Sequence, residues 1–372
     1  MTVKTGPLEM HKGPRTHDDE PAGVAVVGLG YWGPNLLRVL SDKSDAEVRW
    51  ICDLDSDRLQ RFKRRYPAVN TTRDIDQVLA DPRVDAVIVA TPVHTHYKLA
   101  SMALQAGKHV FVEKPLAPSS ALADELGEMA TTRDRVLMCG HTFIYSPPVR
   151  EIKRMLEAGT LGDIYFISSS RVNLGLHQRD VSVIWDLGPH DFSILLYWLS
   201  EMPTTVRAVG RDSIVKGIAD VAFVSMTFAS GIVANVELSW LAPSKLRRTV
   251  LVGSERMVTY DDGAVEPVRV FDSGVVYRDP QTFGEYHLSY RSGDIVSPRI
   301  ESSEPLSLEL GDFVDAIRTG KKMSFHTALA RSVVRIVEAA DLSLTEGGHE
   351  ISLEPAQVDD PLSIERAALA LA

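Results

Sequence analysis

The chain has 372 residues, which is long for one average domain and suggests two. A net charge of -10 disfavours nucleic-acid binding, which needs a basic surface, but leaves room for a small anionic ligand held by local arginines. The two cysteines, Cys52 and Cys139, lie in apolar runs, so we expect reduced core residues and neither a disulfide framework nor a metal site.

The first 22 residues are polar and lack the apolar core of a signal peptide. We expect a flexible tail there, in a cytoplasmic protein. The longest apolar runs, such as residues 24–27 and 86–90, have the length of strands and are too short to span a membrane. The sequence therefore predicts no membrane partner.

Between residues 23 and 144, short apolar runs alternate with helical patterns. We expect strands over residues 24–27, 48–52, 86–90, 109–112 and 136–139. Helical spacing is found over residues 35–40, 56–66, 97–106 and 119–130. Apolar strands separated by helices predict a parallel sheet covered on both faces, so residues 23–144 should form an α/β dinucleotide-binding domain of the Rossmann kind.

The pattern changes after Tyr145. Longer, alternating runs predict strands over residues 164–172, 205–210, 221–228, 232–240 and 249–252. Ala229-Ser230-Gly231 is typical of a hairpin turn between two of them. Helices are expected over residues 149–158, 306–318 and 328–344. Residues 145–353 should therefore form an α+β domain with an open, largely antiparallel sheet, followed by a tail of residues 354–372.

A glycine-rich turn follows the first expected strand. It reads Gly28-Leu29-Gly30-Tyr31-Trp32-Gly33, a G-x-G-x-x-G pattern between a strand and a helix. The first glycine permits the tight turn, the second lets a pyrophosphate approach the backbone, and the third allows close packing of helix and strand. Asp53 ends the second strand, where an acidic residue would bond the adenosine ribose.

Asp53 also favours NAD over NADP, because a carboxylate repels a 2′-phosphate. Its neighbour Leu54 offers no group to hold such a phosphate. Arg58, on the next helix, could stack on the adenine. The other arginines of that helix are more typical of a solvated face.

The tripeptide Glu113-Lys114-Pro115 follows the fourth expected strand. Ligands of open parallel sheets bind at this carboxyl end, so Lys114 could reach both the nicotinamide and a substrate oxygen. An isolated tripeptide of this kind is otherwise an exposed turn.

A second cluster reads Trp185-Asp186-Leu187-Gly188-Pro189-His190-Asp191. Pro189 suits the first position of a helix, which predicts His190 in the first turn. Helix N-terminal amides would then keep its imidazole neutral and able to accept a proton from an alcohol. Asp186, four residues earlier, could orient the ring. The structural alternative is a helix cap with a hydrogen-bonded histidine.

Other candidates lie near the same place. Thr91 and Pro92 end the third strand and should line the cofactor, and His96 is expected at a helix entry or beside the cofactor. Arg171 and Asn173 should share one face of a strand near the substrate floor, with Arg179 just beyond. These three could bind a hydroxyl-rich or phosphorylated substrate, or could be rim residues.

Taken together, these segments resemble the glucose–fructose oxidoreductase / inositol 2-dehydrogenase (Gfo/Idh/MocA) family. The motifs that carry the likeness are the glycine turn, Ala90-Thr91-Pro92 with His96, Glu113-Lys114-Pro115, and Asp186 with His190. The resemblance implies a Rossmann domain with an open-faced sheet domain, and it implies catalytic roles for Lys114, Asp186 and His190.

The glycine turn and the Asp186 cluster are most similar to nucleotide-sugar dehydrogenases and ketoreductases, which often act at C3 in making unusual sugars. The residue after Pro92 is Val93, where many relatives carry asparagine.

Three activities remain open at this point. The first is NAD-dependent oxidation of a sugar or nucleotide-sugar, and the second is an NAD(P)-linked polyol dehydrogenase or keto-sugar reductase. The third is a non-catalytic NAD-binding sensor, since a fold alone does not give function. We also expect a homodimer or homotetramer, because an open sheet leaves one face uncovered.

Overall fold

A computed structural model describes residues 20–175, 177–178, 181–277 and 288–353. Its N-terminal part is a six-stranded parallel sheet in the order β3-β2-β1-β4-β5-β6. The strands are β1 (Ala22–Val27), β2 (Ala46–Cys52), β3 (Asn70–Thr72), β4 (Ala86–Val89), β5 (His109–Glu113) and β6 (Leu137–Gly140). The strand order reverses between β1 and β4, which is where ligands bind in sheets of this topology.

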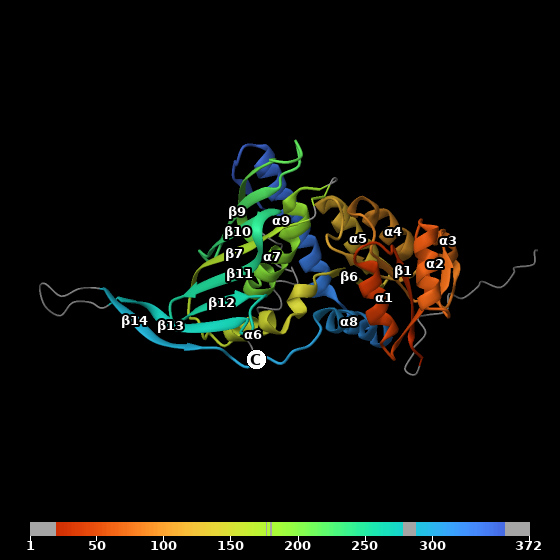
Figure 1. Ribbon diagram of the computed structural model, residues 1–372, viewed down its shortest axis with the longest axis horizontal. Coiled ribbons are helices and arrows are strands. Elements are labelled where there is room, and N and C mark those ends of the chain that lie inside the picture. The colour runs from red at the N-terminus through yellow and green to blue at the C-terminus, as the bar shows by residue number, and fades with distance from the viewer. Residues whose placement is uncertain (1–19, 176, 179–180, 278–287, 354–372) are drawn as a thin grey trace, which may run out of the picture.

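Helices lie between these strands and confirm the expected α/β arrangement (Figure 1). They are α1 (Gly33–Ser41), α2 (Ser56–Arg65), α3 (Ile75–Ala80), α4 (Val93–Gln105) and α5 (Ser120–Thr132). The runs β1, β4, β5 and β6 are buried almost throughout, as a sheet covered on both faces requires. The short edge strand β3 and the helix α3 were not expected from the sequence.

The second sheet has nine strands in the order β14-β13-β12-β11-β7-β10-β9-β8-β15. They are β7 (Ile164–Leu174), β8 (Pro203–Arg211), β9 (Val221–Phe228), β10 (Val233–Ser239), β11 (Leu241–Gly253), β12 (Met257–Asp261), β13 (Val268–Tyr277), β14 (Leu288–Val296) and β15 (Ile351–Ser352). Only β7 and β10 pair in parallel among these described strands, so the sheet is largely antiparallel as expected. The expected turn joins β9 to β10, and its residue Gly231 has a φ of +86°.

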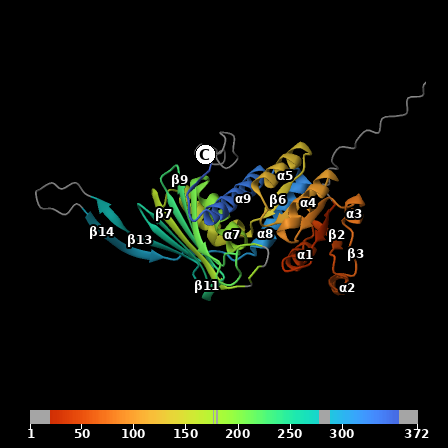
Figure 2. The ribbon, with the colours of Figure 1, turned by 90° about the horizontal axis from the view of Figure 1, so that it is seen from above.

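Four helices and one 3-10 turn accompany this sheet in the described chain. They are η1 (Thr142–Tyr145), α6 (Pro147–Glu157), α7 (Val183–Leu199), α8 (Pro305–Thr319) and α9 (Ser324–Thr345). Figure 2 shows α7 and α9 between the large sheet and the N-terminal domain. The side chains that alternate toward these helices, such as Val224, Met226 and Val236, are buried.

The last two helices join the two halves of the chain. Asp124 on α5 accepts from Arg331 at 2.6 Å and from Arg335 at 2.9 Å, both on α9. The Thr327 hydroxyl donates to the Leu137 carbonyl of β6 at 2.8 Å. These contacts hold α9 against the N-terminal domain.

Candidate active site

The glycine turn has the geometry that a dinucleotide needs. Gly28 has a φ of +94°, and a Cβ there would lie 2.4 Å from the Ala90 carbonyl oxygen. A Cβ on Gly33 would lie 2.0 Å from the Gly28 oxygen, so the start of α1 packs closely on β1. Gly30, by contrast, faces open space, which leaves its backbone accessible to a phosphate. The residues present therefore fit the pyrophosphate of a dinucleotide.

Asp53 also stabilises this turn. Its Oδ2 accepts from the Leu29 amide at 2.6 Å and its Oδ1 from the Asp55 amide at 2.8 Å. Arg58 lies 3.7 Å from the Asp53 carboxylate and 3.3 Å from that of Asp55. The carboxylate thus orders the turn as well as standing where a ribose would bind. Tyr31 and Trp32, on the outer side of the turn, are exposed.

His96 connects the loops that follow β4 and β5. The ring is buried, with Nδ1 2.8 Å from the Pro115 oxygen and Nε2 2.7 Å from the Thr91 oxygen. Burial lowers the pKa of His96, so a neutral ring donates to only one of these carbonyls. His96 therefore positions Thr91, Pro92 and Pro115, the residues expected to line the cofactor.

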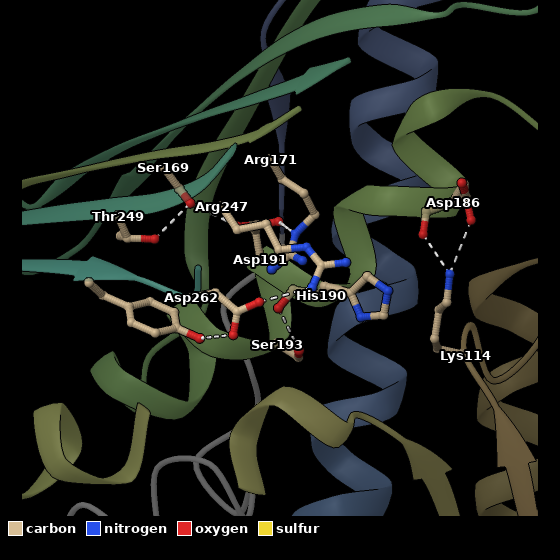
Figure 3. Close-up of polar contacts among 11 residues, drawn as sticks. Lys114, Ser169, Arg171, Asp186, His190, Asp191, Ser193, Arg247, Thr249 and Asp262 are labelled. Carbon is tan, nitrogen blue, oxygen red and sulfur yellow. Dashed lines mark hydrogen bonds and ion pairs between the residues drawn. The ribbon is translucent and has the colours of Figure 1, made fainter. Parts of the chain in front are cut away.

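Lys114 reaches from the end of β5 to the second domain (Figure 3). Its Nζ donates to the Asp186 backbone oxygen at 2.6 Å and to Asp186 Oδ1 at 3.2 Å. Trp240 Nε1 donates to the other carboxylate oxygen at 3.1 Å. The preceding residue, Glu113, is buried, and burial raises the pKa of its carboxyl to about 7.

The environment of His190 differs from the expectation in two ways. Helix α7 begins at Val183 and contains Pro189, so His190 lies in the middle of the helix and not in its first turn. The first turn instead contains Asp186, whose carboxylate accepts from Lys114 and Trp240 and makes no hydrogen bond to His190 in the described structure. The predicted helix start and the predicted orienting role were both wrong.

His190 is kept neutral by burial, and not by a helix N-terminus as expected. Desolvation lowers its pKa well below 6.5, and the positive charges of Lys114, Arg171 and Arg247 lower it further. The ring meets Phe143 edge-on, with centroids 5.0 Å apart, and its buried Nδ1 has no hydrogen-bond partner among the described residues. Figure 3 shows the imidazole between the Lys114–Asp186 pair and the two arginines.

The floor of this region is a buried network on the inner face of the large sheet. Arg171 on β7 pairs with Asp191 of α7, and the carboxylate also accepts from Ser169 at 2.7 Å. Ser169 lies 2.8 Å from the Thr249 hydroxyl. Arg171 and its partner Asp191 are both almost fully buried, so the arginine is a floor residue and not a rim charge.

A second arginine, missed by the sequence reasoning, lies beside Arg171. The register of β11 on β7 places Arg247 directly opposite Arg171. The guanidinium carbon lies 4.5 Å from the Phe143 ring centre in Arg171 and 5.3 Å from it in Arg247. Arg247 also forms an ion pair with Asp262 at 2.9 Å. The period of two along β11 could have found it, because residues 247 and 249 must share a face.

The remaining expected residues are less informative. The Asn173 side-chain oxygen is buried without a hydrogen-bond partner among the described residues. Arg179 lies outside the described residues. Over the described ranges, no cluster of three or more His, Cys, Asp or Glu could hold a metal, and no helix is long and apolar enough to cross a membrane.

Comparisons with known proteins agree with this geometry. Residues 22–141 match the family described as "Oxidoreductase family, NAD-binding Rossmann fold", and residues 149–259 match the "GFO/IDH/MocA C-terminal domain". The chain belongs to the Gfo/Idh/MocA oxidoreductase family. The expected family, fold, oxidoreductase class and NAD cofactor are thereby confirmed.

The chain is similar to several individual proteins of known name. UDP-N-acetylglucosamine 3-dehydrogenase of Acidithiobacillus ferrooxidans is 33% identical over 198 residues, covering 53% of this chain and 59% of that protein, less than two thirds of its length. Myo-inositol 2-dehydrogenase of Thermotoga maritima is 28% identical over 269 residues, 69% of this chain and 78% of that protein. GenD2 from gentamicin A biosynthesis, solved in complex with NAD, is 26% identical with a TM-score of 0.76, over 93% of this chain and 99% of that one.

Proposed function

We propose that this oxidoreductase oxidises a secondary alcohol on the ring of a sugar, with Lys114 and His190 as the residues at the reacting oxygen. The observation that carries the proposal is the meeting of an ammonium and a neutral, buried imidazole at the carboxyl ends of the parallel strands. Ligands of such sheets bind at these ends.

The roles follow from the chemistry of each group. Bound NAD, held by the glycine turn and Asp53, supplies the hydride acceptor. The substrate oxygen lies between Lys114 and His190, and its proton moves to the His190 imidazole as the carbon loses hydride and the C=O bond forms. Lys114 stabilises negative charge on that oxygen, and Asp186 holds the ammonium in place at 3.2 Å. Ketone reduction uses the same groups in reverse.

For the substrate, we infer a nucleotide-sugar oxidised at C3. The support is the likeness to UDP-N-acetylglucosamine 3-dehydrogenase. Arg171 and Asn173 line the floor where ring hydroxyls would lie, and Arg247 belongs with them. The likeness to myo-inositol 2-dehydrogenase supports a second candidate, oxidation of a free polyol.

A substrate panel tests both candidates. The purified protein would be mixed with NAD and with UDP-sugars, free sugars or inositols, and NADH absorbance would be followed. Turnover of UDP-sugars well above that of inositols supports the proposal, and the reverse supports polyol oxidation. NAD binding with no NADH from any sugar or polyol would favour the sensor and refute sugar oxidation.

The proposed assembly is a homodimer or homotetramer formed through the outer face of the large sheet, in a cytoplasmic protein. No described helix covers this face (Figure 2). The face is more polar than expected, because most apolar side chains of β9 and β10 point inward. One row is still apolar: strand register aligns Val233, Phe166, Val252 and Met257 across four strands. Light scattering at micromolar concentration tests this, and a monomer mass would refute it.

A further inference from the structure

His141 lies beside the proposed reaction centre and has no assigned role. Strand β6 pairs in parallel with β5, and the register places Gly140 opposite Glu113. Lys114 directly follows Glu113, and His141 directly follows Gly140. The two residues therefore leave the ends of neighbouring strands, which lie about 4.8 Å apart. Both stand at the carboxyl edge of the sheet, where ligands bind.

The polar atoms of His141 are buried and unpaired. The residue is 2% exposed, and neither ring nitrogen has a hydrogen-bond partner among the described residues. Burial, with smaller effects from His326 and Lys114, lowers the pKa of the ring to about 3. A neutral imidazole carries one N–H donor and one acceptor, and leaving both unpaired in the interior is unfavourable.

Two largely buried histidines outside the proposed site do have hydrogen-bond partners. His326 Nε2 lies 2.8 Å from the Tyr145 hydroxyl, and His109 Nδ1 accepts from the Val136 amide at 3.0 Å. These two rings are held by hydrogen bonds within the protein. His141 is left without any at a position where a ligand would supply them.

The charges around His141 show that its ring lies near both proposed reacting groups. The charge of Lys114 lowers the pKa of His141, and a charge on His141 would lower the pKa of His190. Two residues along the chain, Phe143 packs edge-on against the His190 ring at 5.0 Å. The imidazole is therefore within reach of a molecule held at Lys114 and His190.

We propose that His141 binds the substrate, by a hydrogen bond to the ring hydroxyl next to the carbon that is oxidised. A hydroxyl both donates and accepts, so it pairs with a neutral imidazole in either tautomer. With the substrate oxygen held at Lys114, a neighbouring ring hydroxyl directed toward β6 would meet His141, because β6 is the strand next to β5. This inference rests on the proposed function, because it names one contact of the same site.

The test compares His141→Leu with His326→Leu, since leucine is close in size to histidine and has no polar atoms. His141→Leu should leave the melting temperature of the ligand-free protein unchanged or higher, because it removes two unpaired buried atoms. It should lower kcat/KM for the sugar about tenfold while the Kd for NAD stays the same. His326→Leu should lower the melting temperature and leave KM unchanged.

Two further measurements sharpen the result. His141→Gln, which keeps a side-chain donor and acceptor, should recover part of kcat/KM. A substrate lacking the neighbouring hydroxyl should be a poorer substrate for the wild-type enzyme but not for His141→Leu. A drop in melting temperature like that of His326→Leu, an unchanged kcat/KM, or weakened NAD binding would each overturn the inference.

These outcomes are separate from failure of the proposed function. If the wild-type enzyme oxidises no sugar of the panel, sugar oxidation is refuted. The melting temperatures would still decide whether His141 is a structural residue, because only a structural histidine lowers them when it is replaced. A lowered value would refute a binding role in that case also.

Discussion

Replacing Asp191 should destabilise the second domain strongly. Asp191→Ala leaves the Arg171 guanidinium without its counter-charge, and the arginine side chain is only 5% exposed. Ser169 also loses its acceptor at 2.7 Å, although the Thr249 hydroxyl remains within reach. Breaking a buried ion pair by removing one partner costs about 3–5 kcal/mol.

This magnitude converts into a measurable shift. For a domain of this size, each kcal/mol lowers the melting temperature by about 2–4 °C, so a fall of roughly 6–20 °C is expected. Thermal unfolding followed by circular dichroism at neutral pH measures it. A matched control lies on the opposite face of the sheet, where Glu237 accepts from Ser170 at 2.8 Å in a partly exposed setting. Glu237→Ala should cost about 0.5 kcal/mol or less.

A double variant separates the charge from the packing. Replacing Arg171 by Met together with Asp191 by Leu leaves no stranded charge, so most of the lost stability should return. If Asp191→Ala unfolds at the same temperature as Glu237→Ala, the pair is not desolvated and the reasoning is refuted.

Further expectations concern the reaction itself. Lys114→Ala and His190→Ala should each lower kcat by about 10²–10⁴-fold, because each removes a group at the reacting oxygen. The Kd for NAD, measured by fluorescence, should stay close to that of the wild type. Near-normal turnover of either variant contradicts the role of the residue that it replaces. Asp53→Ala should weaken NAD binding and reduce discrimination against NADP, and it should also lower the melting temperature because the Leu29 amide at 2.6 Å loses its acceptor. Unchanged cofactor selectivity would contradict the ribose assignment. The rate of alcohol oxidation should not fall from pH 8 to pH 6: an imidazole of ordinary pKa 6.5 would be about three-quarters protonated at pH 6, whereas the lowered pKa of His190 keeps it neutral. A stopped-flow pH profile with a midpoint near 6.5 would contradict this.

The N-terminal domain was predictable because its signals are local. The glycine turn is specified by contacts between residues close in sequence, as in the approach of Gly33 to the Gly28 oxygen. Buried parallel strands such as β4 and β5 are recognisable because their central residues form uninterrupted apolar runs. The polar strand β3 was missed because three residues, Asn70 to Thr72, have no periodicity, and its pairing with β2 makes it a strand.

Functional residues held by long-range register were harder to predict. Arg171 and Arg247 are 76 positions apart in the chain and become neighbours only when β11 pairs with β7. The structural role of Asp53 likewise depends on a hydrogen bond across 24 residues to Leu29. Patterns among residues close together in the sequence do not show which distant residues become neighbours in this way.

His190 shows how a sound expectation can rest on the wrong cause. Pro189 suggested a helix start, yet α7 begins six residues earlier at Val183, and the proline lies inside the helix. Proline removes only its own N–H donor, so a helix can continue through it when packing compensates. The neighbouring residues Gly188 and Asp191 are buried, which shows that tertiary packing decides here.

The change of cause has a consequence for the mechanism. A helix N-terminus would disfavour the imidazolium of His190 throughout the reaction, whereas the effect of neighbouring cations depends on the charges beside them. A substrate oxygen that develops negative charge beside Lys114 offsets one of these cations at the moment the proton is transferred. In the proposed mechanism, the proton affinity of His190 is then lowest in the free protein, where the ring must stay neutral, and rises during alcohol oxidation, when the ring accepts the proton.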